Sequence, residues 1–246
     1  MTMQKLLLLS LALLSQAIPA NAQLWLELGA RAGFHFNGIY NDNIASDPQH
    51  DYSLGHALAS GLVAGINVGD YHGINLEVIL ANNQQQFNFR GADSVSTGSV
   101  VNRVNWKTTE LNLLYRYYSD FGAYVEIGPK IAYIREIRQR LGIEPVELDG
   151  EYEKSYLAGI FGIGGFLAAN ETLTLKIGLR ADFALADLVS AKGKAGNYPA
   201  FYTTYPSQKP TRPYRIGVSL ELNFGVGGIA SAQCGHRNLM FGTRYR

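Results

Sequence analysis

Charged side chains recur at alternate positions along this sequence, and they are the residues whose type and spacing could do chemistry. Arg31 follows Glu27 by four residues, and Asp182 follows Arg180 by two. Such spacing places the charges on one face of an extended strand, because successive side chains of a strand point to opposite sides. Facing acids and bases form ion pairs, or carry ions or protons. The set comprises Glu27, Arg31, Glu77, Glu110, Arg116, Glu126, Lys130, Lys176, Arg180, Asp182, Arg215 and Glu221.

Enzyme, cofactor and metal motifs are not found in the sequence. There is no G-x-S-x-G nucleophile motif, and the five histidines are scattered without metal-ligand spacing. Cys234 beside His236 is too little for zinc. The glycine-rich segments 162–165 and 225–228 lack the spacing and the strand-to-helix context of a nucleotide site. The sequence therefore predicts a protein that is not an enzyme and has no cofactor or metal.

Two polar or aromatic segments leave alternatives open. Asp42, Asp47, His50 and Asp51 cluster within ten residues, and they fit either a solvated loop or an enzymatic site. Segment 197–206 carries four aromatic residues and two prolines. It fits a surface that contacts a partner or glycan, or a loop that folds back over the rest of the chain.

The composition excludes several classes of protein. The chain has 246 residues, of which 17% are charged, against about 25% in an ordinary soluble domain. It is too apolar and too neutral to be disordered, and its formal net charge of +1 does not fit a nucleic-acid binder. A single cysteine excludes an intramolecular disulfide. Twenty-seven glycines and 15 tyrosines favour a β protein.

The first 22 residues have the features of a secretory signal peptide. Lys5 precedes a short apolar stretch at 6–14, and Ala20-Asn21-Ala22 is a small-x-small cleavage site. The apolar stretch is shorter than the roughly 20 residues that a spanning helix needs. We expect cleavage before Gln23, which leaves the 20 acidic groups matched by as many basic ones.

Eight segments alternate between apolar and polar residues with the period of a β-strand. The seventh is the clearest, with Leu175, Ile177 and Leu179 opposite Lys176 and Arg180. Glycines in the sixth leave its facing unassigned. The segments are 24–37, 58–68, 74–83, 110–117, 124–133, 156–167, 173–185 and 214–224. Short connections at 69–72, 119–122 and 169–172 alternate with long ones at about 38–56, 82–104, 135–154 and 186–212.

This alternation of turns and loops predicts an all-β chain whose residues 23–224 form an eight-stranded antiparallel transmembrane β-barrel with short periplasmic turns and long extracellular loops. Aromatic residues near the strand ends favour membrane belts over a soluble barrel. At the short turns they are Trp25, Tyr71, Tyr117, Phe121, Phe166 and Phe224, and at the long loops Phe36, Tyr40, Trp106, Tyr133, Tyr156 and Tyr214.

The last strand resembles the sorting signal of outer-membrane barrels, on the residues Arg215, Gly217, Leu220, Leu222 and Phe224. The whole span from Leu24 to Phe224 resembles the small porin-family or OmpA-like barrels, including those of the type IX secretion apparatus. The resemblance implies insertion by the barrel-assembly machinery and residence in the outer membrane. Two features depart from it: Pro129 lies inside a strand, where we expect a local bulge, and 22 residues follow Phe224.

Inside such a barrel the six acids and six bases would fill the lumen. Isolated buried charges are expensive, so a balanced set predicts a network of ion pairs that plugs the barrel. A narrow gated ion path or a proton-linked switch at His35 is the alternative. A general diffusion pore needs about sixteen strands and is not expected.

Residues 225–246 would hang in the periplasm after a glycine-rich hinge. They are either an idle overhang or a docking peptide. In the docking hypothesis Leu239, Met240 and Phe241 are the apolar anchor, Arg237, Arg244 and Arg246 meet an acidic partner, and Cys234 links to it by a disulfide.

The sequence thus favours a non-enzymatic outer-membrane barrel that anchors or organises an envelope assembly, such as a type IX secretion complex, through its periplasmic tail and loops. There are two alternatives. One is a stand-alone structural or adhesive barrel, and the other is an enzyme at the barrel rim that acts on lipid A or peptides. The expected partners are outer-membrane lipid and lipopolysaccharide, the barrel-assembly machinery during insertion, and a periplasmic or outer-membrane protein. No nucleic-acid partner is expected.

Overall fold

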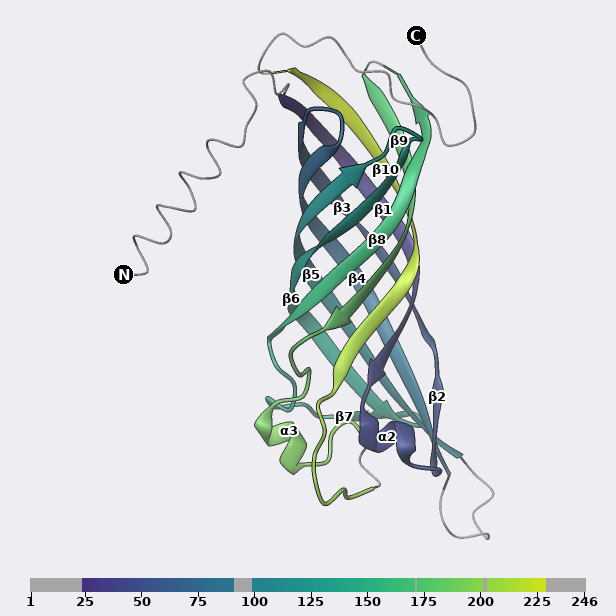
Figure 1. The fold of residues 1–246 in the computed structure, drawn as a ribbon. Coiled ribbons are helices and arrows are strands. Elements are labelled where there is room, and N and C mark those ends of the chain that lie inside the picture. The colour runs from purple at the N-terminus through teal and green to yellow at the C-terminus, as the bar shows by residue number, and fades with distance from the viewer. Residues whose placement is uncertain (1–23, 91–98, 171, 201–202, 229–246) are drawn as a thin grey trace, which may run out of the picture.

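The chain forms one antiparallel sheet whose first and last strands pair, so that the sheet closes into a barrel (Figure 1). The computed structural model describes residues 24–90, 99–170, 172–200 and 203–228. In these residues eight long strands make the ring and two short ones extend its rim, which confirms the predicted fold. The ring runs through β1 (Leu24–Tyr40), β3 (Gly55–Val68), β4 (His72–Arg90), β5 (Ser99–Tyr118), β6 (Ala123–Leu141), β8 (Ser155–Ala169), β9 (Leu173–Ala184) and β10 (Arg212–Gly228); the short strands are β2 (His50–Ser53) and β7 (Glu144–Val146).

Every second strand residue points outward, and most of these outward residues are apolar, so the outer wall of the barrel is apolar. In β9, Leu179 and Phe183 are exposed, whereas Arg180 and Asp182 between them are buried. The same alternation runs through β1, β4 and β10. A contiguous apolar wall of this extent exceeds what the surface of a soluble monomer tolerates. The wall therefore faces lipid, and the barrel is of the transmembrane type.

Short turns join the strands at one end of the barrel and long connections at the other (Figure 1). Gly69 and Gly122, in the turns after β3 and β5, have φ of 62° and 75°, a conformation that glycine adopts without strain. The first strand begins and the last one ends at this same end. No helix among the described residues is long and apolar enough to cross a membrane. The loop end carries the two short helices, α2 (Asp42–Ser46) and α3 (Ala191–Ala195).

The second long connection is much shorter than the sequence predicted. Strand β4 continues to Arg90 and β5 begins at Ser99, so most of the expected loop at 82–104 is strand. The hydrophobic alternation fades there because the outward positions, such as Gln84 and Asn88, are polar. Backbone pairing continues without it. Strand β6 also runs past the predicted end, to Leu141.

Pro129 lies in β6 without the bulge that we expected. The register with β5 is the same at Lys130 and at Ile127, and it lapses only across Gly128 and Pro129. A Cβ on Gly128 would lie 2.0 Å from a backbone carbonyl oxygen of β5. The glycine thus lets the two strands stay close where the proline lacks an N–H. The shift in register between these strands occurs farther along, at Lys107.

Strand β8, which the sequence left unassigned, also alternates. Ile160 points inward and Phe161 outward. Three aromatic residues assigned to the membrane belts lie inside instead, and that part of the prediction is wrong: Trp106, Tyr156 and Phe166 are 2%, 5% and 1% exposed. Phe166 has the same inward facing as Ile160, and the register shift between β8 and β9 comes after it, before Ala168. Other members of the predicted belts are exposed, among them Phe36, Tyr40, Tyr71, Tyr117, Phe121, Tyr133 and Phe224.

Candidate functional site

The structure places all twelve predicted charged residues inside the barrel. None is more than 7% exposed. They come from six of the eight strands: Glu27 and Arg31 from β1, Glu77 from β4, Glu110 and Arg116 from β5, Glu126 and Lys130 from β6, Lys176, Arg180 and Asp182 from β9, and Arg215 and Glu221 from β10.

The two remaining strands, β3 and β8, make room for this set with inward glycines. A Cβ on Gly162 of β8 would lie 2.6 Å from Oε1 of Glu126, and one on Gly65 of β3 would lie 2.6 Å from Oδ1 of Asn75. Gly162, one of the glycines that obscured the pattern in β8, therefore gives the side chain of Glu126 the space it occupies.

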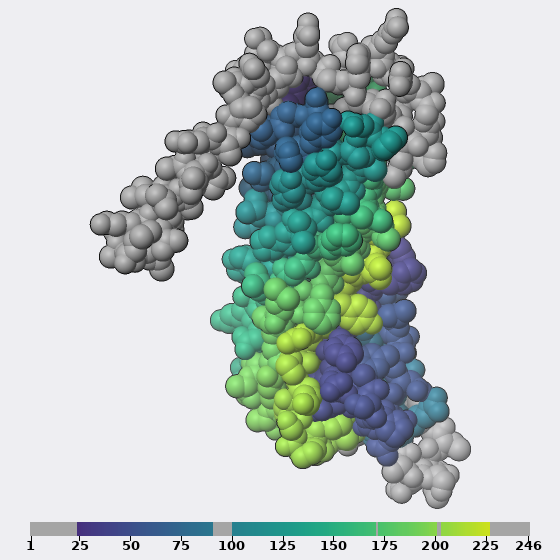
Figure 2. All heavy atoms as spheres, in the orientation of Figure 1, coloured from purple at the N-terminus to yellow at the C-terminus, as the bar shows by residue number. Residues whose placement is uncertain are grey.

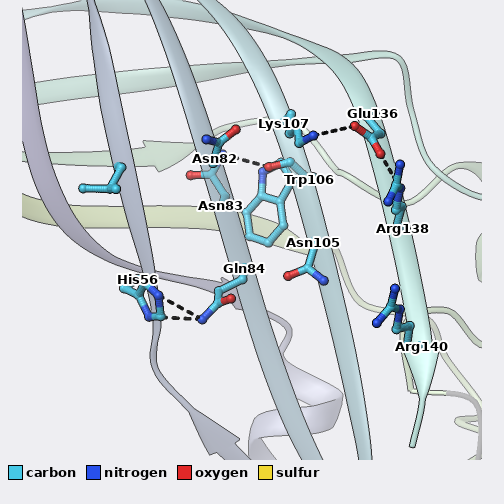
Figure 3. A pocket seen from close by; sticks show the side chains of 11 residues that line it. His56, Asn82, Asn83, Gln84, Asn105, Trp106, Lys107, Glu136, Arg138 and Arg140 are labelled. Atoms are coloured by element: carbon cyan, nitrogen blue, oxygen red, sulfur yellow. Dashed lines mark hydrogen bonds and ion pairs between the residues drawn. The ribbon is translucent and has the colours of Figure 1, made fainter. Parts of the chain in front are cut away.

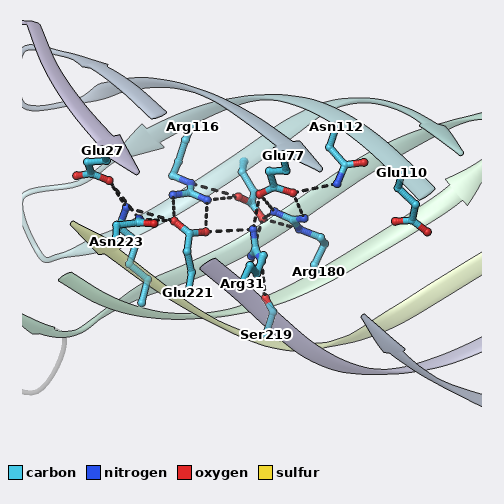
Figure 4. A network of polar contacts seen from close by, with 12 residues as sticks. Glu27, Arg31, Glu77, Glu110, Asn112, Arg116, Arg180, Ser219, Glu221 and Asn223 are labelled. Carbon is cyan, nitrogen blue, oxygen red and sulfur yellow. Dashed lines mark hydrogen bonds and ion pairs between the residues drawn. The ribbon is translucent and has the colours of Figure 1, made fainter. Parts of the chain in front are cut away.

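The central cluster pairs Glu77 and Glu126 with Arg31 and Arg180. Figure 4 labels Glu77 and both arginines. Arg180 donates to both oxygens of Glu77, at 2.7 and 2.9 Å, and to Glu126 at 2.8 Å. Arg31 donates to Glu77 at 2.7 Å and to the hydroxyl of Ser219 at 2.8 Å. Each buried carboxylate is met by charge-assisted hydrogen bonds, which offset the cost of removing it from water.

A second cluster lies toward the short turns. Arg116 forms two bonds of 2.9 Å with Glu221, and Lys176 binds Glu27 at 2.7 Å. Arg116 also donates to Glu126 at 2.8 Å, which joins this cluster to the central one (Figure 4).

A third cluster lies toward the loops. Asp182 accepts from Lys130 at 2.6 Å and from Arg215 at 2.8 Å. Arg215 reaches Glu110 at 2.7 Å, and the hydroxyl of Thr108 donates to Glu110 at 3.0 Å. Every acid and every base of the set is therefore engaged, and the three clusters follow one another along the lumen.

Aromatic rings close the lumen beside the second cluster. Tyr118, Tyr124 and Phe166 pack together there. The guanidinium of Arg116 lies 4.5 Å from the centre of the Tyr124 ring, and the ammonium of Lys176 lies 5.5 Å from that of Phe166. Cations over aromatic faces are attracted by the ring quadrupole, so the rings both fill space and hold the charges.

His35, the candidate for a proton-linked switch, is buried at 4% exposure. Its ring lies against Gly33 and Gly217, since a Cβ on either would come within 3 Å of it. The Nδ1 atom finds no hydrogen-bond partner in the described part of the chain. The structure therefore shows no relay from this nitrogen to the ion pairs.

The loops form a hydrophobic core over the other end of the lumen. Phe87 and Trp106, near the loop ends of β4 and β5, pack in one cluster with Ile39, Ile44 of α2 and Leu188 of the last loop. Each of these five residues is at most 2% exposed. We call this cluster and the loops that build it the cap.

Hydrogen bonds tie the first loop to the last across the cap. Asn41 accepts from two N–H groups at the start of α2 and donates to the hydroxyl of Thr211 at 2.8 Å. Tyr205 donates to Asp47 at 2.9 Å, and the ring of His50 contacts the same carboxylate at 2.9 Å. The two loops lie side by side in Figure 2, the first in purple and the last in yellow-green.

The environment of Asp47 favours its charged form. Partial burial raises its pKa, but the N–H of Gln49 and the side chains of Tyr205 and His50 outweigh that effect, so the pKa lies below the ordinary 3.8. The pKa of Tyr205 is raised, first by burial and then by its bond to this carboxylate.

The acidic and histidine residues of the predicted rim site separate into three contacts. Asp47 and His50 lie together, whereas Asp51 pairs with Arg90. Asp42 accepts from the hydroxyl of Tyr40. The side chain of His50 is 1% exposed, which leaves a substrate no access to it. No group of three His, Cys, Asp or Glu in the described residues could hold a metal.

The described part of the last loop folds back over the barrel. The carbonyl of Pro199 accepts from the amides of Asn102 and Gln139, at 2.5 and 3.1 Å. Tyr198 packs edge-on against Tyr152, with 5.8 Å between ring centres. The sequence left two interpretations of this loop open, a surface that contacts a partner or glycan and a loop that folds back over the rest of the chain. The contacts of the described residues fit the second interpretation. Phe201 and Tyr202 lie outside the described residues.

The remaining predicted residues divide between the last strand and the undescribed ends of the chain. In β10, Arg215 and Gly217 point inward, and Leu220, Leu222 and Phe224 point outward. The signal peptide lies outside the described residues. So do the docking residues Cys234, Arg237, Leu239, Met240, Phe241, Arg244 and Arg246.

Sequence reasoning did not assign the neutral partners of the charges, which are Thr108, described above, and four more residues. Asn112 donates to Glu77 at 2.9 Å and Asn223 donates to Glu221 at 2.6 Å. Ser219 binds Arg31, and Tyr118 lies beside Arg116 and Lys176. All four lie an even number of residues from an inward charge on the same strand, so they point inward as well. This spacing could have identified them from the sequence.

Solved structures similar to this chain are bacterial outer-membrane barrels. Neisserial surface protein A is 11% identical with a TM-score of 0.42, over 80% of this chain and 95% of that one. OprG from Pseudomonas aeruginosa is 14% identical with a TM-score of 0.39, over 83% and 94%. The outer membrane protease OmpT from Escherichia coli is 11% identical with a TM-score of 0.30, over 84% and 97%. No family model and no curated protein sequence matches the chain.

Proposed function

We propose that this chain is a non-conducting, non-enzymatic barrel of the outer membrane that anchors an envelope assembly through its loops and its periplasmic tail. The closed lumen is the observation that carries the proposal. Ion pairs join all twelve lumen charges, aromatic rings lie at their short-turn end, and the cap lies at their loop end. A barrel closed in this way offers its surfaces, rather than a passage, to other molecules.

The orientation follows from the turns and loops. Outer-membrane barrels have short turns on the periplasmic side and longer loops outside. Strand β10 ends at the short-turn end, so residues 229–246 would enter the periplasm there. A tail with three arginines and an apolar Leu239-Met240-Phe241 segment is suited to an acidic partner with an apolar pocket. An accessory barrel of the type IX secretion apparatus, of the porin-family or OmpA-like type, is the specific form of this proposal.

Conductance measurements test the first part of the proposal. The full mature chain would be folded from urea into detergent and added to planar lipid bilayers at neutral pH. We expect heat-modifiable gel migration, as for a folded barrel, and no single-channel steps. Reproducible steps from heat-modifiable protein would contradict a closed lumen.

Co-purification tests the second part. Affinity-tagged full-length protein, a variant lacking residues 230–246 and Cys234→Ser would each be cross-linked in cells and purified. With cross-linker, we expect the full-length protein and Cys234→Ser to capture one defined partner that the shortened chain does not. In a second purification, without cross-linker and under non-reducing conditions, the full-length protein should keep this partner through a disulfide and Cys234→Ser should lose it. An identical set of partners for the full and the shortened chain would refute docking by the tail and favour a stand-alone structural or adhesive barrel.

A further inference from the structure

The outer wall changes from apolar to polar within four residues on strands β4 and β5 and within five on β6. Pairing of these strands aligns Leu62, Val78, Leu111 and Ile131 in one cross-strand row of exposed apolar residues. Four residues along each of β3, β4 and β5, the corresponding row is Leu58, Asn82, Lys107 and Glu136. The apolar wall therefore adjoins a polar surface directly, on the side of the barrel toward the loops.

A pocket of about 380 Å³ lies on this polar surface (Figure 3). Three cations line it, Lys107, Arg138 and Arg140, and Glu136 is its one acid. Glu136 binds Lys107 at 2.8 Å and also pairs with Arg138. Arg140 has no ion pair within the described residues. Lys107 and Arg138 remain 50% and 67% exposed, so the pocket keeps an excess of accessible positive charge.

An apolar groove of about 860 Å³ continues from this pocket along the wall. Leu58, Asn82 and Lys107 line both hollows. The groove runs over the small residues Ala32 and Ser60, and its sides are the exposed Phe34, Leu80, Val218 and Leu220. One continuous site is therefore apolar at one end and cationic at the other.

We propose that this continuous site binds a phosphate-bearing lipid of the outer leaflet, with an acyl chain along the groove and the phosphate over Lys107, Arg138 and Arg140. Guanidinium groups bind phosphate through paired, charge-assisted hydrogen bonds, and basic pockets beside a membrane surface recognise lipid head groups. A free phosphate would use the cations alone. The apolar groove, which opens on the lipid-facing wall, selects the acylated form.

The proposal goes beyond the proposed anchoring role and depends on the wall facing lipid and on the loops lying outside the cell. It also accounts for polar residues on outward positions that are apolar elsewhere in the same strands. Glu136 has a place in this arrangement, because it holds Lys107 and Arg138 toward each other while leaving their donors exposed.

Native mass spectrometry of the full mature chain in a neutral detergent would test the site, with diphosphoryl lipid A as the probe. Phosphatidylcholine and inorganic phosphate would be the comparison ligands. We expect lipid A to bind at least about tenfold more tightly than either, and Arg138→Gln/Arg140→Gln to weaken it about tenfold. Arg90→Gln, an exposed arginine outside the pocket, is the matched control and should bind as the unchanged protein does.

A second variant separates the acyl groove from the cations. Ser60→Phe fills the groove from an exposed, lipid-facing position and leaves all three cations in place. We expect it to weaken lipid A binding and to leave inorganic phosphate binding unchanged. Equal binding of lipid A by the unchanged protein and the double arginine variant would overturn the proposal. So would phosphate binding as tight as that of lipid A, which would leave an anion site without lipid selection.

Discussion

Glu77 shows how a single residue holds the lumen together. Its carboxylate is fully buried and accepts from Arg31, Arg180 and Asn112 over distances of 2.7 to 2.9 Å. Replacing a whole buried ion-pair set with apolar residues is often neutral, but removing one partner leaves the others buried and uncompensated. The stability of the barrel is therefore sensitive to single charges in the lumen even if the set as a whole adds little.

We predict that Glu77→Gln destabilises the barrel by about 3 to 5 kcal/mol, because two buried arginines lose their shared counter-charge. Urea unfolding in lipid vesicles, followed by tryptophan fluorescence and gel migration, measures the change. Glu147→Gln removes an exposed loop carboxylate and serves as the control, with an expected change below about 0.5 kcal/mol. Equal effects of the two substitutions would show that the lumen charges do not act as a network.

Asp47 makes the cap sensitive to acid. Because its pKa in the folded protein lies below the ordinary 3.8, its contribution to stability is complete above that value and is lost as the pH falls through the folded pKa. We predict that Trp106 in the cap becomes more accessible to acrylamide over this acidic range. The measurement is fluorescence quenching in a Trp25→Phe background.

Asp47→Asn removes the ionisation and should show raised quenching of Trp106 at neutral pH with no further step in acid. Asp42→Asn changes an exposed carboxylate of the same loop and should keep the step. A step that persists unchanged in Asp47→Asn would assign the acid response to other groups.

At the scale of the element, β6 tolerates its proline through the glycine beside it. Gly128→Ala places a Cβ 2.0 Å from a β5 carbonyl oxygen, so the two strands must separate. We predict a loss of about 1 to 3 kcal/mol, the usual cost of overpacking, in the same urea assay.

Gly159→Ala is the matched control for that substitution. Gly159 lies opposite Pro129 on β8, and nothing lies within 4 Å of the Cβ it would gain. We expect no loss, and up to about 1 kcal/mol of gain from the restricted unfolded chain. A neutral Gly128→Ala would mean that the close contact between β5 and β6 is not what compensates for the proline.

The strands also show what the sequence predicts and what it does not. Period-2 alternation predicted the facing of β9 correctly because one side meets lipid and the other meets charge. It failed beyond residue 82 in β4, where the outward positions are polar and the inward positions mix Asn83 and Gln85 with Phe87, so that backbone pairing alone defines the strand. In β8, Gly162 has no side chain to reveal its facing, and a register shift after Phe166 ends the regular alternation before Ala168.

The candidate site, too, could be predicted from the sequence in part only. The twelve lumen charges could be placed from the sequence because inward residues occupy every second position of the strands that carry them. Their partners could not be predicted, since Arg116 and Glu221 lie 105 residues apart and meet only when the ring closes. The outer pocket was missed because Gln84, Arg138 and Arg140 were assigned to long loops, where polar residues need no explanation.

For the molecule as a whole, the lumen is closed at two levels that share almost no residues. The ion-pair clusters and the aromatic rings fill the transmembrane part, and the cap covers the loop end. The cap is built from loops and strand ends, whereas the charges sit on the strands of the ring. The two closures are therefore expected to act in series and to fail independently.

We predict that replacing residues 191–210 with a short Gly-Ser linker leaves the barrel non-conducting, because the ion pairs still fill the lumen. Glu77→Ala/Arg180→Ala keeps the lumen neutral and shortens two central side chains, and on its own it should not conduct either, because the cap remains. Combined, the two changes should give single-channel steps in planar bilayers. Single-channel steps from the linker variant alone would mean that the loops are the only barrier. If the combined variant shows heat-modifiable gel migration but no steps, the remaining charged clusters close the lumen by themselves.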